Sequence, residues 1–292
     1  MQQASASGIS APNARLAVLA LLVAAFAIGC SPIFVRLSEL GPVATGCYRT
    51  ALGAPVLVLM ARGERLASGT DLALLTLAGF CFAGDLATWH WSIRLTSVAN
   101  ATLLANLAPI VVTAGAWFLF GERITLGFLG ALAGAVLGCA VLAADRLALG
   151  SGLAGDGLAL ATAFFYGGYF LVLSRVRARV GAAQAMAVTA ITCSLFLLPL
   201  AMLSGEAMLP PSPRGWLILV ALALVSQVAG QTLIGWALKH LPASYSALSL
   251  LLQPVVAALL AWSLLGESLG GFQIAGGLII LASIAAGRRA SR

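Results

Sequence analysis

Apolar segments separated by short polar breaks occupy almost the whole chain. A helix needs about 20 predominantly apolar residues to cross a membrane. Ten segments have approximately this length: 16–35, 41–61, 71–93, 98–120, 124–143, 152–175, 183–203, 215–239, 243–265 and 271–287. The pattern therefore predicts an all-α membrane protein with ten transmembrane helices.

The two halves of the chain are related by an internal repeat with a constant offset of 145 residues, as in 236 − 91 and 254 − 109. Five positions match in one register without a gap: Trp91 with Trp236, Arg94 with Lys239, Pro109 with Pro254, Gly121 with Gly266 and Glu122 with Glu267. We interpret this as a tandem duplication with five helices in each copy. Because five is odd, the second copy enters the membrane from the other side. Inverted-topology repeats of this kind are common in secondary transporters, whose substrates bind near the midplane between the halves.

The repeat sets the predicted domain boundaries. We expect a disordered cytoplasmic N-terminus over 1–14, a first five-helix repeat over 15–147, a second, inverted repeat over 148–288, and a cytoplasmic tail over 289–292. Lys and Arg mark the cytoplasmic side of membrane proteins. With the N-terminus placed in the cytoplasm, eleven Lys and Arg residues fall on the cytoplasmic side and four on the outer side. Both termini are therefore predicted to be cytoplasmic.

Composition agrees with a membrane protein and excludes several other classes. Hydrophobic residues make up 61% of the chain and charged residues 9%, whereas soluble domains are about half apolar and a quarter charged. The net charge of +7 comes from single basic residues at helix ends, so no nucleic-acid partner is predicted. The five cysteines lie inside apolar segments without metal-ligand spacing, and no phosphate-binding glycine loop occurs. We therefore predict no metal and no cofactor.

The chain resembles the drug/metabolite transporter superfamily, EamA type. The resemblance rests on the five-plus-five helices, on Pro109 and Pro254 inside the fourth and ninth helices, and on a Gly-Glu pair closing each of these helices. Within that family it is most similar to the YddG-type amino-acid exporters of the bacterial inner membrane. The resemblance implies export of aromatic and other neutral amino acids by alternating access, through a cavity lined mainly by helices 1, 3, 4, 6, 8 and 9. Other family members move nucleotide sugars, triose phosphates, polyamines and drugs.

Polar and aromatic side chains within apolar helices are the predicted substrate-binding residues, because such groups face a cavity or another helix and not lipid. They are Tyr166, Asn106, Tyr169, Trp89, His90, Gln231 and Ser249. The alternative for the amide and hydroxyl groups is an ordinary hydrogen bond between helices. For the tyrosines it is an aromatic belt at the membrane interface.

Pro109 and Pro254 are predicted hinges. Proline inside a helix leaves the carbonyl four residues earlier without its donor, here that of Ala105 and of Leu250. Polar or wet surroundings are then expected around these carbonyls. The alternative is a static kink that serves only packing.

Two opposite charges lie inside the predicted helices. Arg49 and Asp85 are each eight residues from the outer end of their helix, about 12 Å deep at 1.5 Å per residue. We expect them to form a structural ion pair, with a substrate or proton site as the alternative. Only Arg49 is a deep cation, so neutral or zwitterionic substrates fit better than sugar phosphates.

Small residues predict how two helices pack. Gly130, Gly134 and Gly138 in the fifth helix, and Gly276 and Gly277 in the tenth, allow close approach. We expect these two helices to pack on each other within one chain, as a monomer, with dimerisation through the same face as the alternative.

Amino acids and membrane lipid are the predicted partners, and the predicted location is the bacterial inner membrane. A facilitator that follows the substrate gradient is credible, because few acidic residues lie within the helices. Three other classes stay open: an exporter of other metabolites or drugs, a channel or receptor, and a membrane-embedded enzyme using Asp85 and His90. The enzyme is disfavoured because these two residues do not share a helix face and no second acid or nucleophile joins them.

Overall fold

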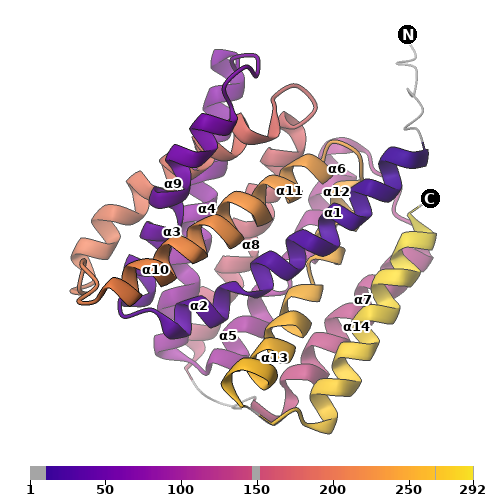
Figure 1. Cartoon of the computed structure of the whole chain (residues 1–292). Coiled ribbons are helices and arrows are strands. Elements are labelled where there is room, and N and C mark those ends of the chain that lie inside the picture. The colour runs from indigo at the N-terminus through magenta and orange to yellow at the C-terminus, as the bar shows by residue number, and fades with distance from the viewer. Residues whose placement is uncertain (1–10, 147–151, 267, 292) are drawn as a thin grey trace.

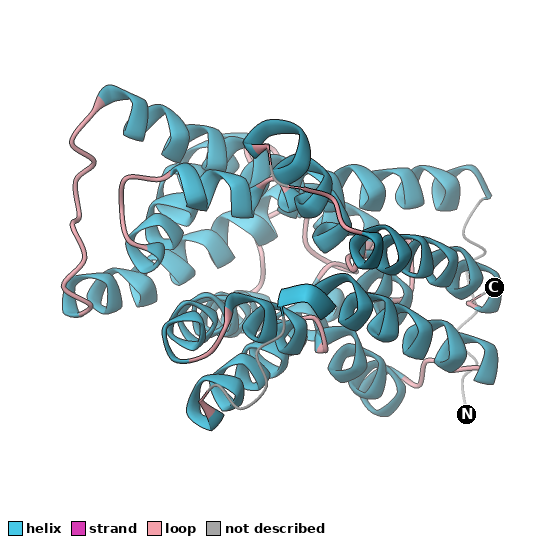
Figure 2. Ribbon diagram, turned by 90° about the horizontal axis from the view of Figure 1, so that it is seen from below, coloured by secondary structure: helices cyan, strands magenta, loops and turns pink. Residues whose placement is uncertain are grey.

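The computed structural model describes residues 11–146, 152–266 and 268–291, and within these ranges every regular element is helical (Figures 1 and 2). Ten helical stretches in the described chain are long and apolar enough to cross a membrane, and their ends lie within three residues of the predicted ones. They are Asn13–Leu37, Pro42–Met60, Gly69–Leu95, Asn100–Phe120, Leu126–Ala143, Leu153–Val176, Ala182–Leu203, Pro213–Ala237, Ala243–Leu265 and Gly271–Ala290. The fold is a ten-helix bundle made of two five-helix repeats of inverted topology.

Six of the spans are single helices: α3 (Pro42–Met60), α4 (Gly69–Leu95), α7 (Leu126–Ala143), α8 (Leu153–Val176), α9 (Ala182–Leu203) and α14 (Gly271–Ala290). The other four spans are divided. The first span consists of α1 (Ala11–Gly29) and α2 (Ser31–Leu37), the fourth of α5 (Val98–Ala105) and α6 (Ala108–Phe120), and the ninth of α12 (Ala243–Ser249) and α13 (Leu252–Leu265). The eighth span consists of α10 (Pro213–Leu222) and α11 (Gln231–Ala237), which are separated by a π-helical turn over Ala223–Gly230. The predicted features that fall outside the described residues are most of the N-terminal segment, the boundary between the repeats at 147–148, Glu267, and Arg292 of the C-terminal tail.

Short polar side chains determine where several helices begin. Ser68, Ser97, Thr125 and Ser212 each accept a hydrogen bond from a backbone N–H in the first turn of the following helix, which is the usual role of these residue types at an N-cap. The helices α6 and α13 end at Gly121 and Gly266, whose φ values are 66° and 69°. Glycine adopts this left-handed conformation without steric cost, which explains why the glycine of each Gly-Glu pair recurs.

The main helix pairs join one repeat to the other. The helix α3 packs on α9, α4 on α8, and α7 on α14, while α1 packs on the π-helical turn and α11. Figure 1 shows α7 and α14 side by side along their whole length. The two repeats are therefore interlocked through a shared core.

Close packing of α7 on α14 has a simple steric basis. A Cβ atom added at Gly276 would lie 2.5 Å from the carbonyl oxygen of Gly138, and one added at Gly134 would lie 2.7 Å from Ser283 Oγ. Only glycine at these positions allows the two backbones to approach this closely. The predicted packing of the fifth helix on the tenth within one chain is confirmed.

Glutamates in the loops bind helix N-termini of the other repeat. Glu64 accepts a hydrogen bond of 2.9 Å from the Gln184 N–H at the start of α9, and Glu206 accepts one of 2.9 Å from the Ala44 N–H at the start of α3. The two contacts are reciprocal, because each glutamate follows the helix that the other one caps. Glu206 also forms an ion pair of 2.8 Å with Arg94.

Glu122 of the first Gly-Glu pair has the same role. Its carboxylate accepts hydrogen bonds from the N–H of Ala243 at 2.8 Å, the N–H of Ser244 at 3.3 Å and the Ser244 hydroxyl at 2.6 Å. A negative charge at this point also interacts favourably with the dipole of α12. The glutamate therefore ties the end of the fourth span to the start of the ninth.

Candidate functional site: a cavity between the repeats

A cavity of about 220 Å³ lies where the two repeats meet, and seven of the ten spans line it. The contributing spans are the first, third, fourth, sixth, eighth and ninth, as expected, together with the second, which adds Gly46 and Arg49. Its apolar wall includes Ile28, Phe82, Leu86, Trp89, Leu222 and Ala257. Its polar groups are Ser31, Arg49, Asp85, His90, Thr102, Asn106, Thr162, Tyr166, Gln231 and Gln253. This combination suits a small molecule with a polar head and an apolar body.

The cavity extends toward the face opposite the two termini. Val35, near the end of the first span, and Thr102, near the start of the fourth, both line it. A second, smaller pocket of about 40 Å³ continues toward the termini and is lined by Pro109, Ala247 and Leu250, among others. Both pockets are lined by the same four residues, Ala105, Asn106, Tyr166 and Gln253. These four residues therefore stand between the two pockets.

The fourth and ninth spans are both broken at this level. The helix α5 ends at Ala105 and α6 begins at Ala108, while α12 ends at Ser249 and α13 begins at Leu252. Pro109 is the second residue of α6 and Pro254 the third of α13. The prediction that the prolines lie in the interior of a helix is therefore wrong, because each proline lies in the first turn of a new helix, where its missing N–H costs little.

The Leu250 carbonyl, which was expected to lack a hydrogen-bond donor, has one. It accepts a hydrogen bond of 2.9 Å from the backbone N–H of Gln253. A tight backbone turn satisfies this carbonyl, so no polar surroundings are needed for it.

Arg49 is held at the wall of the cavity by weak contacts. Its side chain is buried, with 7% of its surface exposed. Nη1 donates to Ser31 Oγ at 3.3 Å, and the guanidinium carbon lies 5.7 Å from the centre of the Phe82 ring. Nε is buried, and no described residue forms a hydrogen bond with it.

The expected ion pair between Arg49 and Asp85 is not formed in this structure. Both side chains line the cavity, but among the described residues the ion pairs are Arg94 with Glu206 and Arg179 with Asp71. Equal depth along two helices does not fix the directions of the side chains, and here Arg49 is directed to Ser31 and Phe82 instead.

His90 and Trp89 line the cavity together, with their rings 5.1 Å apart. His90 is almost completely buried, and its Nδ1 has no hydrogen-bond partner in the described part of the chain. Gly46 on α3 makes room for it, because a Cβ at this position would lie 3.3 Å from His90 Cε1. An unpartnered buried nitrogen beside a cavity is a group available to a ligand.

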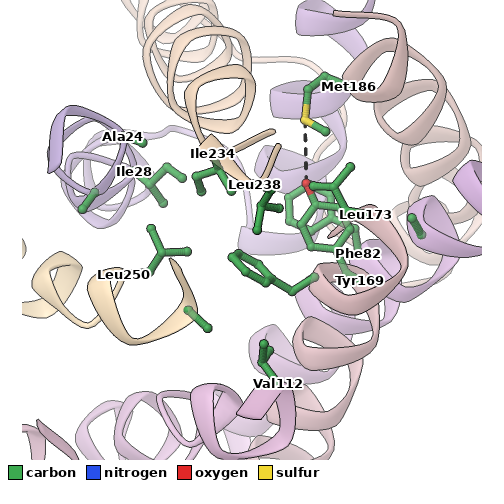
Figure 3. Close-up of a cluster of buried hydrophobic side chains, with 14 of the residues drawn as sticks. Ala24, Ile28, Phe82, Val112, Tyr169, Leu173, Met186, Ile234, Leu238 and Leu250 are labelled. Atoms are coloured by element: carbon green, nitrogen blue, oxygen red, sulfur yellow. Dashed lines mark hydrogen bonds between the residues drawn. The ribbon is translucent and has the colours of Figure 1, made fainter. Parts of the chain in front are cut away.

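Tyr169 and Ser249 do not line the cavity, contrary to expectation. The Tyr169 hydroxyl donates to Gln231 Oε1 at 3.0 Å, and its ring stacks on Phe82 with centroids 4.9 Å apart. Figure 3 shows Tyr169 beside Phe82, with its hydroxyl directed toward Met186. The Ser249 hydroxyl donates to the Tyr245 carbonyl of its own helix at 2.9 Å. Tyr169 therefore contacts two residues that line the cavity, Phe82 and Gln231, from the side away from it. The hydrogen bond of the Ser249 hydroxyl is made within α12.

Several cavity residues were not selected from the sequence. Gln253 stands directly before Pro254 and belongs to the polar stripe that includes Ser249, so its position carried a signal. Thr102 lies four residues before Asn106 in the polar group of the fourth span, so it also carried a signal. Ser31, Phe82 and Thr162 carried none, because single small hydroxyls and phenylalanines are common in membrane helices. The remaining predicted site residues, Trp89, His90, Asn106, Tyr166 and Gln231, all line the cavity.

Comparison with known proteins places the chain in a family. The EamA-like transporter family model matches residues 15–144 and 153–286. The pseudopaline exporter CntI of Pseudomonas aeruginosa is 26% identical over 243 residues, which cover 82% of this chain and 84% of that protein. A probable terminal-alkyne amino-acid exporter of Streptantibioticus cattleyicolor is 27% identical over 275 residues, covering 91% and 90%.

A solved crystal structure has the same fold. It superposes with a TM-score of 0.78 and covers 96% of this chain and 99% of its own chain, at 19% sequence identity. The family match extends over both five-helix repeats and includes all the residues that line the cavity. The chain belongs to the EamA-like transporter family.

Proposed function

We propose that this protein is a secondary transporter that exports neutral amino acids, aromatic ones among them, across the bacterial inner membrane by alternating access. The observation that carries the proposal is the 220 Å³ cavity between two inverted repeats, with an apolar wall, one basic side chain, Arg49, and one acidic side chain, Asp85. Secondary transporters with inverted repeats bind substrate at this position. The relative from Streptantibioticus cattleyicolor, named an amino-acid exporter, supports the substrate class.

In the proposed orientation both termini are cytoplasmic. The larger cavity then extends toward the periplasm, and the smaller pocket toward the cytoplasm. Substrate passes from one to the other when Asn106, Tyr166 and Gln253 separate. The breaks at Pro109 and Pro254 lie at the same level and act as hinges for this change, because helix ends can absorb large changes of backbone angle.

The test is uptake into proteoliposomes that contain the purified protein. Labelled phenylalanine, threonine and a sugar phosphate are compared, each with and without a proton gradient. We expect saturable uptake of phenylalanine without a gradient and no uptake of the sugar phosphate. Absence of amino-acid uptake under both conditions would remove the substrate assignment and leave the family assignment in place.

A second candidate is export of a specialised metabolite, because another relative is named a pseudopaline exporter. Uptake of that compound, with no competition by phenylalanine, would favour this candidate.

A further inference from the structure

A basic and an acidic side chain face one cavity without forming an ion pair with each other. Arg49 and Asp85 line the same space, and His90 is the only other ionisable group apart from Tyr166 among its described lining residues. No ion pair involving either charge is formed within the described chain. A charge inside a membrane protein is costly unless it has a partner. These two side chains therefore occupy the membrane interior without the contact that would normally stabilise them.

Arg49 retains donor capacity toward the cavity. Among the described residues, its one side-chain hydrogen bond is the long contact of 3.3 Å to Ser31 Oγ, and Nε has no partner there although the side chain is buried. Guanidinium groups carry five N–H donors and bind carboxylates with two parallel hydrogen bonds. A carboxylate that enters the cavity would supply hydrogen-bond acceptors for the Arg49 N–H groups that have none among the described residues.

Asp85 lies close enough to share a ligand with Arg49. The Arg49 guanidinium stands over Phe82 at 5.7 Å, and Phe82 precedes Asp85 by three residues on α4. Side chains three residues apart on a helix are about 5–6 Å apart at Cβ. The Asp85 side chain makes no hydrogen bond or ion pair within the described chain, and it is only partly buried. It can therefore accept from an ammonium group in the cavity.

We propose that Arg49 and Asp85 are the specificity-determining residues of the transporter and recognise, respectively, the carboxylate and the ammonium group of a free amino acid. The inference rests on the proposed function and assigns residues to it. A zwitterion supplies an opposite charge to both side chains at once, whereas a ligand with a single charge leaves either Arg49 or Asp85 without a charged partner. Leu86 and Trp89, which line the same cavity, are placed to contact the apolar side chain of the ligand.

Binding to the purified wild-type protein in detergent, measured by calorimetry, tests this directly. The probes are phenylalanine, 2-phenylethylamine, which lacks the carboxylate, and 3-phenylpropionate, which lacks the ammonium group. We expect phenylalanine to bind at least tenfold more tightly than either analogue. Equal binding of all three would overturn the inference while leaving the proposed function standing. Binding of none of them would overturn both.

Two variants identify the residues. Asp85→Asn should weaken phenylalanine binding at least tenfold and leave 3-phenylpropionate binding unchanged or improved. Arg49→Gln should have the corresponding effect, with 2-phenylethylamine binding retained. Glu39→Gln is the matched control, because it removes an exposed carboxylate that binds Ser212 outside the cavity, and its selectivity should equal that of wild type. A folded Asp85→Asn variant with wild-type selectivity would contradict the assignment. The wild-type series decides the question even if a variant fails to fold.

Discussion

At the scale of single residues, the cavity depends on side chains that do not touch it. Tyr169 is almost fully buried, stacks on Phe82 and donates to Gln231 Oε1. Both of its partners line the cavity. Tyr169 thus fixes the orientation of one aromatic and one amide group that face the ligand space.

Tyr169→Phe tests this supporting role. The change keeps the ring and leaves Gln231 Oε1 without its donor, which costs about 1–3 kcal/mol for a buried polar atom. We expect a lower thermal unfolding midpoint in detergent, measured by tryptophan fluorescence. Tyr166→Phe is the matched control and should lower the midpoint less, because the Tyr166 side chain lines the cavity, where water can replace a lost contact. A larger loss for Tyr166→Phe would contradict this picture.

The same two tyrosines show what sequence can predict about a site. Residues three apart lie about 60° apart around a helix axis, given 3.6 residues per turn. This difference is enough to place Tyr166 in the cavity and Tyr169 in the packed core behind it. A polar stripe therefore identifies the correct helix face but cannot separate ligand contacts from contacts between helices. Arg49 and Asp85 were likewise predicted at the same depth, yet their side-chain directions could not be known.

At the scale of elements, carboxylates connect the two repeats at helix ends. Glu64, Glu122 and Glu206 each accept hydrogen bonds from the first turn of a helix in the other repeat. Such contacts combine a satisfied N–H group with a favourable interaction with the helix dipole. They fix the distance between loop and helix on both faces of the bundle.

Glu122→Ala should therefore destabilise the bundle. The N–H groups of Ala243 and Ser244 lose their acceptor, and removal of a helix cap typically costs about 1 kcal/mol. The neighbouring exposed Arg123 provides the control, because Arg123→Ala removes a charge and no described contact. The unfolding midpoints of both variants in the same detergent decide the point. Equal midpoints would show that the cap contributes nothing.

Packing of α7 on α14 gives a second prediction at this scale. Gly276→Ala places a methyl group against backbone atoms of Leu142 and Gly138, and overpacking of this kind typically costs about 1–3 kcal/mol. Gly130→Ala, in α7 itself, meets no atom within 4 Å and should be neutral or slightly stabilising, since alanine favours helix. Comparison of the two thermal midpoints tests the packing. Similar values for both would refute it.

The broken spans predict an effect on transport. Pro109→Ala and Pro254→Ala restore a backbone N–H, so the two helix pieces can join into one continuous helix. If the breaks are hinges, transport in proteoliposomes should fall several-fold while the thermal midpoint is retained or rises. Unchanged transport together with unchanged stability would show that the prolines serve only packing.

The ends of the spans could be predicted from the sequence, but the breaks inside the spans could not. Continuous apolar length determines the ten spans, so their ends were within three residues of those observed. The breaks at Asn106 and Leu251 and the π-helical turn at Ala223–Gly230 depend on packing against other spans. Ser226, for example, donates to the Ala27 carbonyl of α1 at 2.9 Å, and no local pattern specifies this contact.

At the scale of the whole molecule, the inverted repeats share a core, and the 220 Å³ cavity lies between them. The cavity extends toward one face and is separated from a smaller pocket on the other side by Asn106, Tyr166 and Gln253. Under the proposed alternating access, substrate binds at one site that faces each side of the membrane in turn. A channel would instead be open to both sides at once.

The most direct test of this account is counterflow in proteoliposomes. Vesicles are loaded with unlabelled phenylalanine and diluted into a trace of labelled phenylalanine, with no ion gradient applied. Alternating access predicts faster, transient accumulation of label than in unloaded vesicles, because loaded carriers return with substrate from inside. Uptake that is independent of internal phenylalanine and does not saturate would contradict the carrier mechanism.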